Sequence, residues 1–348
     1  MYAKEPQNKP DFFAHRRDVM LDCKNYSENA AEYIDTFEVV TDTAIRTRLA
    51  DPDDPADNIA AVMRVTNGRA WTAIKYLHLQ YTAGVPLAHL RDFYPLALEY
   101  WEEYAKYDKA FDETPEAGGR KVPHLDLYDD DYWFAIRLCC FAILLGHTNL
   151  LPRLCAIWDY ENDDMDGLLE RLVAPFVPGR AAPPSECTRH LPYFKTLKIF
   201  AAEPAKRPAM MQRYLEEWYI ASRREPYYES HTDGRSHNYL GYWSFEAAAI
   251  TVLLNIDDGS YRDMDFYPKD LADYARTLPA QTSALIRPER LRGLPNELVP
   301  RTGWWWSPAF TGADALRHFN QGEHFPSTET TNYGGVFWYY DADRQPKE

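Results

Sequence analysis

Apolar residues recur at helical spacing along most of the chain. From about residue 12 to residue 278 they lie three and four positions apart, as Trp71, Ile74 and Leu77 do. The alternation of apolar and polar residues that is typical of strands is scarce in this range. Glycine and proline divide the pattern into segments of helical length, at Gly84-Val85-Pro86, Gly118-Gly119, Pro175 to Gly179 and Pro183-Pro184. The pattern predicts a mainly α fold, with a body that is a helical bundle or helical repeat.

Two changes in sequence texture predict domain boundaries. The stretch from Val177 to Pro184 is rich in proline and alanine and separates an N-terminal helical region, residues 1–178, from a C-terminal helical region, residues 185–280. After about residue 280 the helical spacing weakens, and the sequence favours turns and short strands, as in Gly303 to Pro308 and Val336 to Tyr340. We therefore predict a small β-containing module at residues 281–348, whose tryptophans fill a small core.

The two helical regions contain similar segments, which suggests that they are related halves. Asp92 to Tyr100 resembles Asp265 to Tyr274, since both contain Phe-Tyr-Pro followed by a helical pattern. Tyr132 to Arg137 resembles Tyr242 to Ala247, although the order of the two elements differs between the halves. We expect the proline of each Phe-Tyr-Pro motif in the first turn of a helix, where its missing N–H costs nothing.

Composition and charge limit the possible partners. The 348 residues are 45% hydrophobic and 15% aromatic, which indicates a globular protein. Acidic residues outnumber basic ones by 53 to 38, giving a formal charge of −15 that repels nucleic acid and anionic membranes and attracts a basic partner. The same charge would also serve solubility alone, so both interpretations remain open.

The sequence favours a cytoplasmic location. It has no run of 18 apolar residues and no apolar stretch near the N-terminus that would be typical of a signal peptide. Five cysteines make an odd count without CxxC spacing, and we expect them to be reduced core residues. They are Cys23, Cys139, Cys140, Cys155 and Cys187.

Sequence motifs for catalysis and cofactor binding are missing. The chain has no GxxxxGK[ST], GxGxxG or GxSxG motif. His231, Asp233 and His237 lie close together, but their spacing fits no standard zinc pattern. Asn255 to Gly259 is similar to the start of a calcium loop that lacks its closing glutamate. We therefore predict no catalytic residue, cofactor or metal site.

A buried carboxylate leaves one enzymatic alternative open. Glu246 lies in a helix that is otherwise apolar through Leu254, so burial would raise its pKa and suit it to proton donation. We favour a structural ion pair with a cation such as Arg137. The alternative is a carbohydrate-active hydrolase of helical toroid type, with paired carboxylates and aromatic rings that stack on sugars. The spacing of the rings favours helix packing instead, for Tyr100, Trp101, Tyr104, Tyr214, Trp218 and Tyr219.

Acidic residues form three groups beside aromatic residues at predicted helix ends. Some of them would cap helices, but capping explains only one or two acids in each group. The rest would form an acidic rim that steers a basic protein into contact. The groups are Asp126, Asp129, Asp130 and Asp131; Asp159, Glu161, Asp163, Asp164 and Asp166; and Asp257, Asp258, Asp263 and Asp265 around Tyr261. From them we predict partner contacts by Asp129, Asp130, Asp131, Glu161, Asp163, Asp164, Asp257, Asp258 and Tyr261.

The stretch from Tyr193 to Arg276 resembles a known family. Its most specific parts are Tyr239 to Ala249, Asp257 to Arg262 and Tyr267 to Leu271, and they are similar to the helical PoNi-like immunity proteins. Members of that family neutralise polymorphic toxins with a DNase domain, which are commonly delivered between bacteria by type VI secretion. The tail, with Gly303 to Ala309 and Phe319 to Glu323, is similar to a C-terminal module of some proteobacterial immunity proteins.

The resemblance implies a binding protein without catalytic residues of its own. It would form a stoichiometric complex with a cognate toxin that has a basic surface, and it would bind neither nucleic acid nor membranes. A helical scaffold for other partners is a third possible function.

Overall fold

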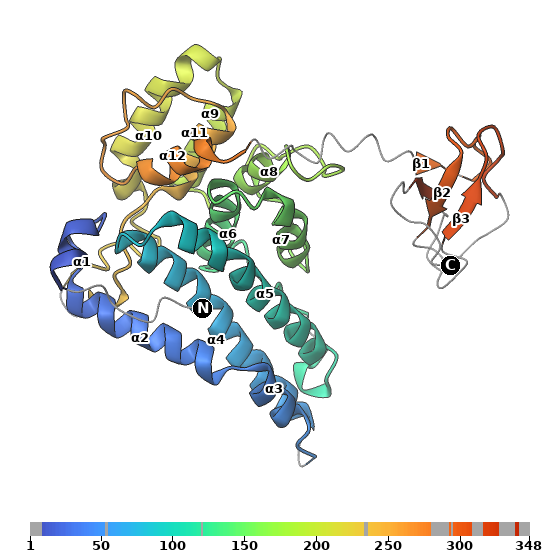
Figure 1. The fold of residues 1–348 in the computed structure, drawn as a ribbon, viewed down its shortest axis with the longest axis horizontal. Helices are drawn as coiled ribbons and strands as arrows, with labels where there is room; N and C mark the ends of the chain where they lie inside the picture. Colours follow the sequence, from blue (N-terminus) through green and yellow to red (C-terminus); the bar gives the residue numbers. More distant parts are fainter. Residues whose placement is uncertain are drawn as a thin grey trace. The chain divides into compact units, whose positions relative to one another are not determined.

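The structure of this chain is a computed structural model that describes residues 9–52, 55–119, 121–232, 236–279, 292–293, 295–307, 316–326 and 338–340. The chain folds into two compact units, Met1–Ser283 and Ala284–Glu348. Figure 1 shows the helices of the first unit and the strands of the second. Each unit has its own hydrophobic core.

The first unit is helical, which confirms the prediction from the apolar spacing. Short 3-10 turns join several of its α-helices. None of the helices in the described ranges has the length and hydropathy needed to span a membrane. The α-helices are α1 (Lys9–His15), α2 (Cys23–Val39), α3 (Asp42–Leu49), α4 (Pro55–Thr82), α5 (Leu87–Asp112), α6 (Tyr132–Leu144), α7 (Leu151–Trp158), α8 (Gly167–Val173), α9 (Leu197–Ala201), α10 (Arg207–Ala221), α11 (Phe245–Leu253) and α12 (Lys269–Thr277).

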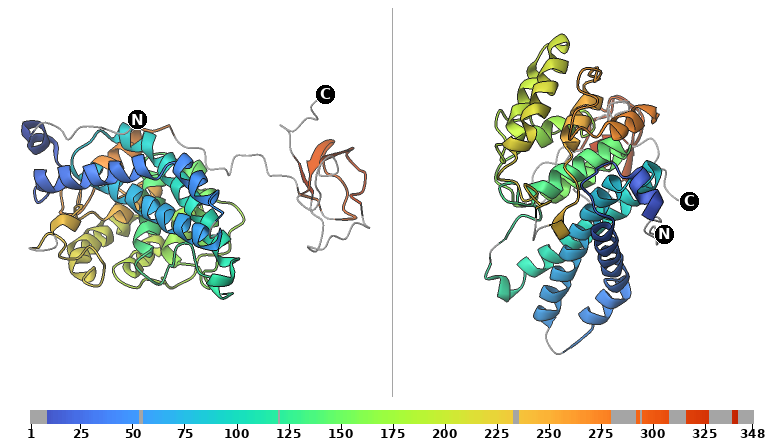
Figure 2. Two further views of the ribbon diagram at one scale, coloured as in Figure 1. Left: turned by 90° about the horizontal axis from the view of Figure 1, so that it is seen from below. Right: turned by 90° about the vertical axis from the view of Figure 1, so that its left-hand side faces the viewer.

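The longest helices, α4 and α5, form a hairpin with α2 packed along α4 (Figures 1 and 2). The turn between α4 and α5 contains Gly84, whose φ of 88° is unfavourable for other residues. A Cβ atom at this position would lie 1.9 Å from the carbonyl oxygen of His15, so the chain before α2 also requires glycine here. Gly84 thus fixes both the hairpin and the approach of the N-terminal segment.

Helices α6 and α11 form the centre of the first unit. Every residue of α6 is buried, and so is every residue of α11 from Phe245 to Thr251. These helices pack against each other, and α6 also contacts α4, α5, α7, α8 and α12. A helix that is apolar all round can be stable only when other elements surround it. Cys139 and Cys140 lie within α6 and are fully buried, as predicted.

The two Phe-Tyr-Pro motifs adopt different structures. Pro268 directly precedes α12, close to the predicted position. Pro95 lies inside α5, more than one turn after its start at Leu87, so the prediction of a first-turn position is wrong for this proline. The periodic residues on both sides of Pro95 pack against the core, and this packing outweighs the hydrogen bond that proline cannot donate.

The second unit contains a small antiparallel sheet in the order β1-β4-β2-β3. Trp305 and Trp338 are fully buried and pack with Val299, Phe319 and Phe325. The described residues thus confirm a small β-containing module with tryptophan in its core. The strands are β1 (Arg292–Gly293), β2 (Gly303–Trp306), β3 (Leu316–Phe319) and β4 (Trp338–Tyr340).

Candidate partner-binding surface

The loop before α6 contains four aspartates with different local roles. The carboxylate of Asp126 accepts a hydrogen bond from the N–H of Tyr128 at 2.9 Å, and that of Asp129 accepts one from the N–H of Asp130 at 2.8 Å. Asp131 occupies the N-cap position of α6, yet its side chain makes no capping hydrogen bond. Turn formation therefore accounts for two of these aspartates, and helix capping does not account for the group.

The second acidic group lies beside the first. The side chain of Asn162 joins the two loops, because its Nδ2 donates to the carbonyl oxygen of Leu125 at 2.7 Å and its Oδ1 accepts from the N–H of Leu127 at 3.1 Å. The hydroxyl of Tyr128 donates to the carboxylate of Asp164. Two groups that are separate in sequence thus share one surface.

We call Asp129, Asp130, Asp163 and Asp164, together with Tyr128, the acidic surface. All five residues are exposed, and Tyr128 keeps 53% of its area in solvent. Asp130 forms an ion pair with Arg189 at 2.9 Å. Within the described residues, no basic side chain lies within ion-pair distance of the other three aspartates. The surface therefore keeps most of its negative charge.

Other acids near this surface are paired or have structural roles. Glu161 is exposed but pairs with Lys121 at 3.7 Å, and Asp159 pairs with Arg180 at 2.8 Å. Asp166 is buried and caps α8, accepting hydrogen bonds from the first N–H groups of that helix at 2.8 and 2.9 Å. These residues hold the loop in position and add little unpaired negative charge to the acidic surface.

Asp131 differs from its exposed neighbours because it is partly buried. The pKa of its carboxyl is raised to about 6, chiefly by burial and also by charge repulsion from Asp126, Asp129 and Asp130, while a hydrogen bond from the backbone of Asp126 lowers it. Near neutral pH this residue therefore carries a costly charge at the edge of the acidic surface.

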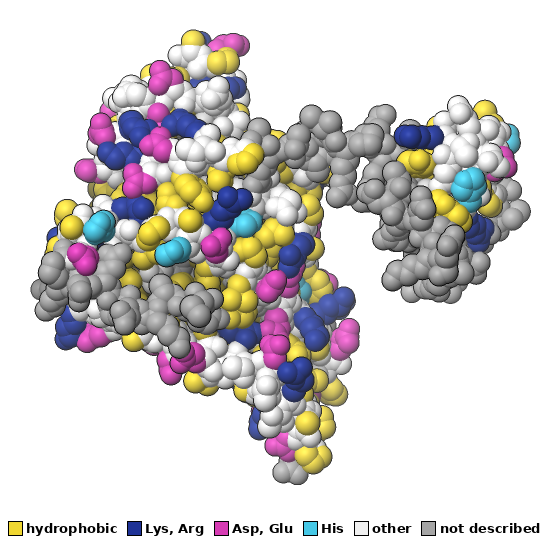
Figure 3. Space-filling model, in the orientation of Figure 1, with side chains coloured by type: hydrophobic (Ala, Val, Ile, Leu, Met, Phe, Trp, Pro, Cys, Tyr) yellow, Lys and Arg dark blue, Asp and Glu magenta, His cyan; other side chains and the backbone are white. Residues whose placement is uncertain are grey.

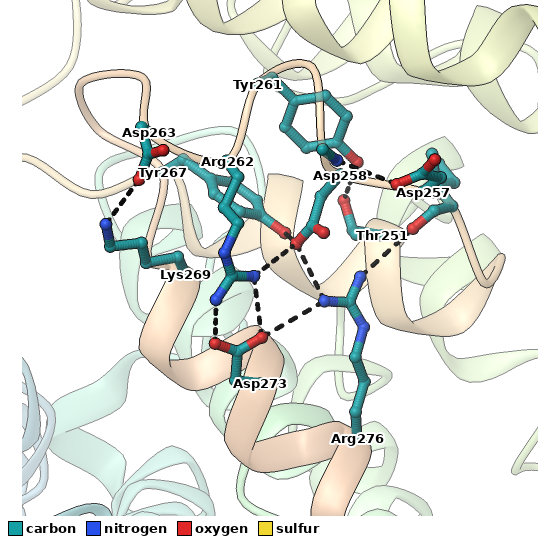
Figure 4. Close-up of polar contacts among 12 residues, drawn as sticks. Thr251, Asp257, Asp258, Tyr261, Arg262, Asp263, Tyr267, Lys269, Asp273 and Arg276 are labelled. Carbon is teal, nitrogen blue, oxygen red and sulfur yellow. Dashed lines mark hydrogen bonds and ion pairs between the residues drawn. The ribbon is translucent and has the colours of Figure 1, made fainter.

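The third acidic group forms an internal ion network (Figure 4). One carboxylate oxygen of Asp258 accepts hydrogen bonds from Arg276 at 2.9 Å, from the hydroxyl of Tyr267 at 3.0 Å and from Arg262 at 3.4 Å. Arg262 also donates to Asp273 at 2.8 Å. We call Asp258, Arg262, Tyr267, Asp273 and Arg276 the ion network, and it joins the loop after α11 to α12.

Of the three residues predicted in this third group, only Asp257 is exposed. Its carboxylate accepts a hydrogen bond from the N–H of Gly259 at 3.0 Å and closes a turn. Asp258 is buried, and Tyr261 is fully buried with its hydroxyl 2.8 Å from that of Thr251. The loop folds back against α11 and turns the ring of Tyr261 into the core, away from the surface.

The predicted ion pair between Glu246 and Arg137 is wrong. One carboxylate oxygen of Glu246 instead accepts three hydrogen bonds, each 2.7 Å long, from the hydroxyls of Tyr214 and Ser244 and from Nε1 of Trp218. Neutral donors therefore satisfy this buried carboxylate and hold it in a structural role between α10 and α11.

Arg137 is buried, and it forms no ion pair among the described residues. Its guanidinium lies over the ring of Trp133, 3.7 Å from the centroid, and its Nε donates to Nδ1 of His78 at 3.3 Å. Burial lowers the pKa of Arg137, while the more distant Tyr193, Tyr227, Glu246 and Glu225 raise it. A cation–π contact thus replaces the expected carboxylate.

The described residues give no support to a hydrolase or a metal site. The aromatic rings that a sugar would need are buried between helices, namely Trp101, Tyr104, Tyr214 and Trp218. His231 bonds the hydroxyl of Tyr242 at 2.6 Å, and Asp233 lies outside the described residues. In the described part of the chain, no three His, Cys, Asp or Glu side chains are grouped as metal ligands would be.

A basic pocket beside the acidic surface was missed in the sequence. It has a volume of about 560 Å³, and its lining includes three arginines and two acids, namely Arg189, Arg223, Arg224, Asp130 and Glu225. The arginine pair at positions 223 and 224 was a visible signal, but only the fold shows that it faces the loop before α6. Charges of both signs therefore meet at this surface.

Comparison with known proteins supports the resemblance to immunity proteins. Residues 164–271 match the C-terminal region of PoNe immunity proteins (PoNi). The fold is similar to the crystal structure of protein PA2201 from Pseudomonas aeruginosa, with a TM-score of 0.62 and 24% sequence identity over 75% of this chain and 90% of that chain. No curated protein has significant sequence similarity to this chain.

Proposed function

We propose that this chain, whose residues 164–271 match the C-terminal region of PoNe immunity proteins, neutralises a cognate nuclease toxin by forming a stoichiometric complex with it. The family match is the observation that carries the proposal. It extends from Asp164, in the acidic surface, through α8 to the start of α12, and so includes the ion network's loop.

The acidic surface supports a basic partner. A nuclease must attract the DNA backbone, so its substrate-binding face is usually basic. Three exposed aspartates without basic partners would meet such a face with complementary charge, which accelerates association and orients the partner. On the face that Figure 3 shows, acidic and basic side chains are interspersed with hydrophobic ones.

We place the complex in the cytoplasm of the cell that makes the toxin, and we propose a DNase delivered by type VI secretion as the target. The immunity protein would cover the DNA-binding face of the toxin. Exposed Tyr128, among the aspartates, would provide apolar contact area in the complex. The charged residues would chiefly determine the association rate and the choice of partner.

Co-expression with the neighbouring toxin gene tests this proposal. We expect survival of the host, a co-purifying complex of one to one stoichiometry and loss of plasmid DNA degradation in vitro. Changing Asp129, Asp130 and Asp131 together to Asn should slow association and reduce its salt dependence, as measured by stopped-flow or surface plasmon resonance.

Absence of both rescue and complex would refute the immunity function. A complex whose rate and salt dependence are unchanged in the triple variant would keep that function and exclude this loop from the interface.

A further inference from the structure

A second pocket lies on the other side of Asp130 and has a different character. Its volume is about 310 Å³, which is within the range of small-ligand sites. Its walls come from α2, α4, the start of α6 and the segments 226–230 and 238–241. Tyr33, Trp71, Trp133, Phe134 and Tyr227 give it an aromatic lining.

The lining contains several hydrogen-bond donors without acceptors. Among the described side chains, the buried ring nitrogens of Trp71, His78 and Trp133 have no hydrogen-bond partner. His78 is only 1% exposed and Trp133 only 6%, so bulk water does not compensate for the missing acceptors. A buried donor without an acceptor is costly, and three residues that carry one, from α4 and α6, line this pocket.

The state of His78 can be assigned from its neighbours. Its Nδ1 accepts a hydrogen bond from Arg137 at 3.3 Å, so the proton lies on Nε2. Burial and the adjacent Arg137 hold the pKa of His78 well below its usual range, while the backbone of Gly241 raises it. This backbone group does not form a hydrogen bond of normal geometry with Nε2 of His78. His78 therefore stays neutral and presents an N–H.

Two charged groups in this pocket form no ion pair among the described residues. Lys75 is partly buried, and within the described residues its ammonium has no ion pair; burial lowers its pKa and Glu32 acts in the other direction. Asp131 lies in the same lining without a cation. Asp130, the other acid, already pairs with Arg189. Arg137 lies over the ring of Trp133 and adds positive charge beside this lining residue.

We propose that this pocket binds a carboxylate, carried on an apolar or aromatic body. The aromatic walls would contact the body, and Lys75 and the unpartnered N–H groups would stabilise the anion. The side chains around the covered nitrogens must shift slightly for direct contact, which the partly exposed ring of Trp71 permits. The carboxylate is either that of a small molecule or an acidic side chain of a protein partner. The proposal does not depend on the toxin, because the pocket can be tested on the isolated chain.

Titration calorimetry of the full chain with benzoate, benzylamine and benzyl alcohol tests whether the pocket prefers an anionic, a cationic or a neutral ligand. We expect benzoate to bind more tightly than the other two probes. Lys75→Gln should weaken benzoate about tenfold, and Asp131→Asn should strengthen it about two- to fivefold. Lys24→Gln, on α2 and with 81% of its side chain exposed, is the matched control and should change nothing.

Opposite results would overturn the proposal. If benzylamine binds more tightly and Asp131→Asn weakens it, the pocket is an aromatic cage for a cation. No benzoate binding at about 10 mM, or benzoate binding that neither variant changes, would also refute it. Circular dichroism verifies folding of each variant, and Trp71→Phe, which keeps a ring but removes an N–H, is a second probe expected to weaken benzoate severalfold.

The toxin complex separates the two sources of the carboxylate. If Lys75→Gln weakens the complex about tenfold and Lys24→Gln does not, an acidic side chain of the partner occupies the pocket. If Lys75→Gln leaves the affinity for the toxin unchanged, and the complex of the parent chain still binds benzoate, the pocket serves a small molecule. Failure to obtain a complex would count against the proposed function and leave the benzoate result to decide this proposal.

Discussion

The acidic surface and the ion network contain similar residues but differ in exposure and in ion pairing. Both contain several aspartates beside a tyrosine in a loop between helices. In the acidic surface the tyrosine, Tyr128, is exposed and only one aspartate pairs with a cation. In the loop of the ion network, Tyr261 is buried and Asp258 is held by two arginines and a tyrosine hydroxyl.

The difference arises from where the cations lie along the chain. Arg262 is one helical turn after Asp258, and Arg276 reaches it from α12, so the second loop brings its own countercharge. The acidic stretch of the first loop, from Asp126 to Asp131, has no lysine or arginine, and the one ion pair of its aspartates comes from Arg189, far along the chain. An acidic loop is therefore a candidate interface when most of its carboxylates form no ion pair in the folded structure.

The largest expected effect is on stability, from Asp258→Ala. Removing this carboxylate leaves two arginines and the Tyr267 hydroxyl without their acceptor. Because the arginines are about one third exposed, we expect a loss of about 2–3 kcal/mol in the free energy of unfolding, below the cost in a fully buried pair. Urea denaturation measures it. Asp257→Asn, which keeps the turn residue exposed, should change stability by less than about 0.5 kcal/mol; equal effects of both variants would refute the structural role of the network.

The next effect is on toxin binding and compares the two loops at equal charge. Changing Asp129, Asp163 and Asp164 to Asn raises the net charge from −15 by three to −12, and so does changing Asp257, Asp263 and Asp265. We expect the first variant to weaken the complex about thirtyfold, mostly through slower association, and the second by less than about threefold. Association and dissociation rates at two salt concentrations provide the measurement.

The outcome of this comparison assigns the interface. Equal losses for the two variants would show that net charge and not position matters. A larger loss for the second variant would move the interface to the loop of Asp257.

Helical spacing predicted the first unit well because burial of an apolar face is a local property of the sequence. The continuous apolar runs of α6 and α11 became the central helices, and the change of texture near residue 280 became a small sheet. Pro95 was misplaced because tertiary packing on both sides outweighed the local preference of proline for a helix start. Local rules thus determine the type of an element better than its ends.

The candidate site was less predictable because it depends on pairs that are distant in sequence. Glu246 was expected beside Arg137, but the fold supplies three neutral donors from α10 and from its own turn. The pocket around Trp71, His78 and Trp133 joins residues from two helices, and no local motif marks it. Buried hydrogen-bond donors without acceptors can be identified only from the positions of the side chains in the folded structure.

Asp131 should make the stability of the protein depend on pH. Its pKa is about 6 in the folded chain and ~3.9 when unfolded, so the folded state binds the proton more tightly. This contribution to stability is fully present below about pH 4 and is lost as the pH rises through 6. We expect Asp131→Asn to be about 1–2 kcal/mol more stable than the parent at pH 7.5 and similar at pH 4, by urea denaturation. Asp129→Asn is the control, and a constant difference at both pH values would contradict the shifted pKa.

The smallest effect, from Tyr261→Phe, separates core from interface most directly. The sequence suggested an anchor for the partner, whereas the structure buries the ring and pairs its hydroxyl with that of Thr251 at 2.8 Å. Phenylalanine keeps the ring packing against Tyr267 and removes one buried hydrogen bond, so stability should fall by about 1 kcal/mol. Toxin affinity, measured well below the unfolding temperature, should not change.

Tyr128→Phe provides the opposite control, because the exposed tyrosine contributes little to stability and loses its bond to Asp164 at the acidic surface. If Tyr261→Phe instead weakens the complex and leaves stability intact, the loop of the ion network must open to bind the toxin, and the distinction between the two acidic loops fails.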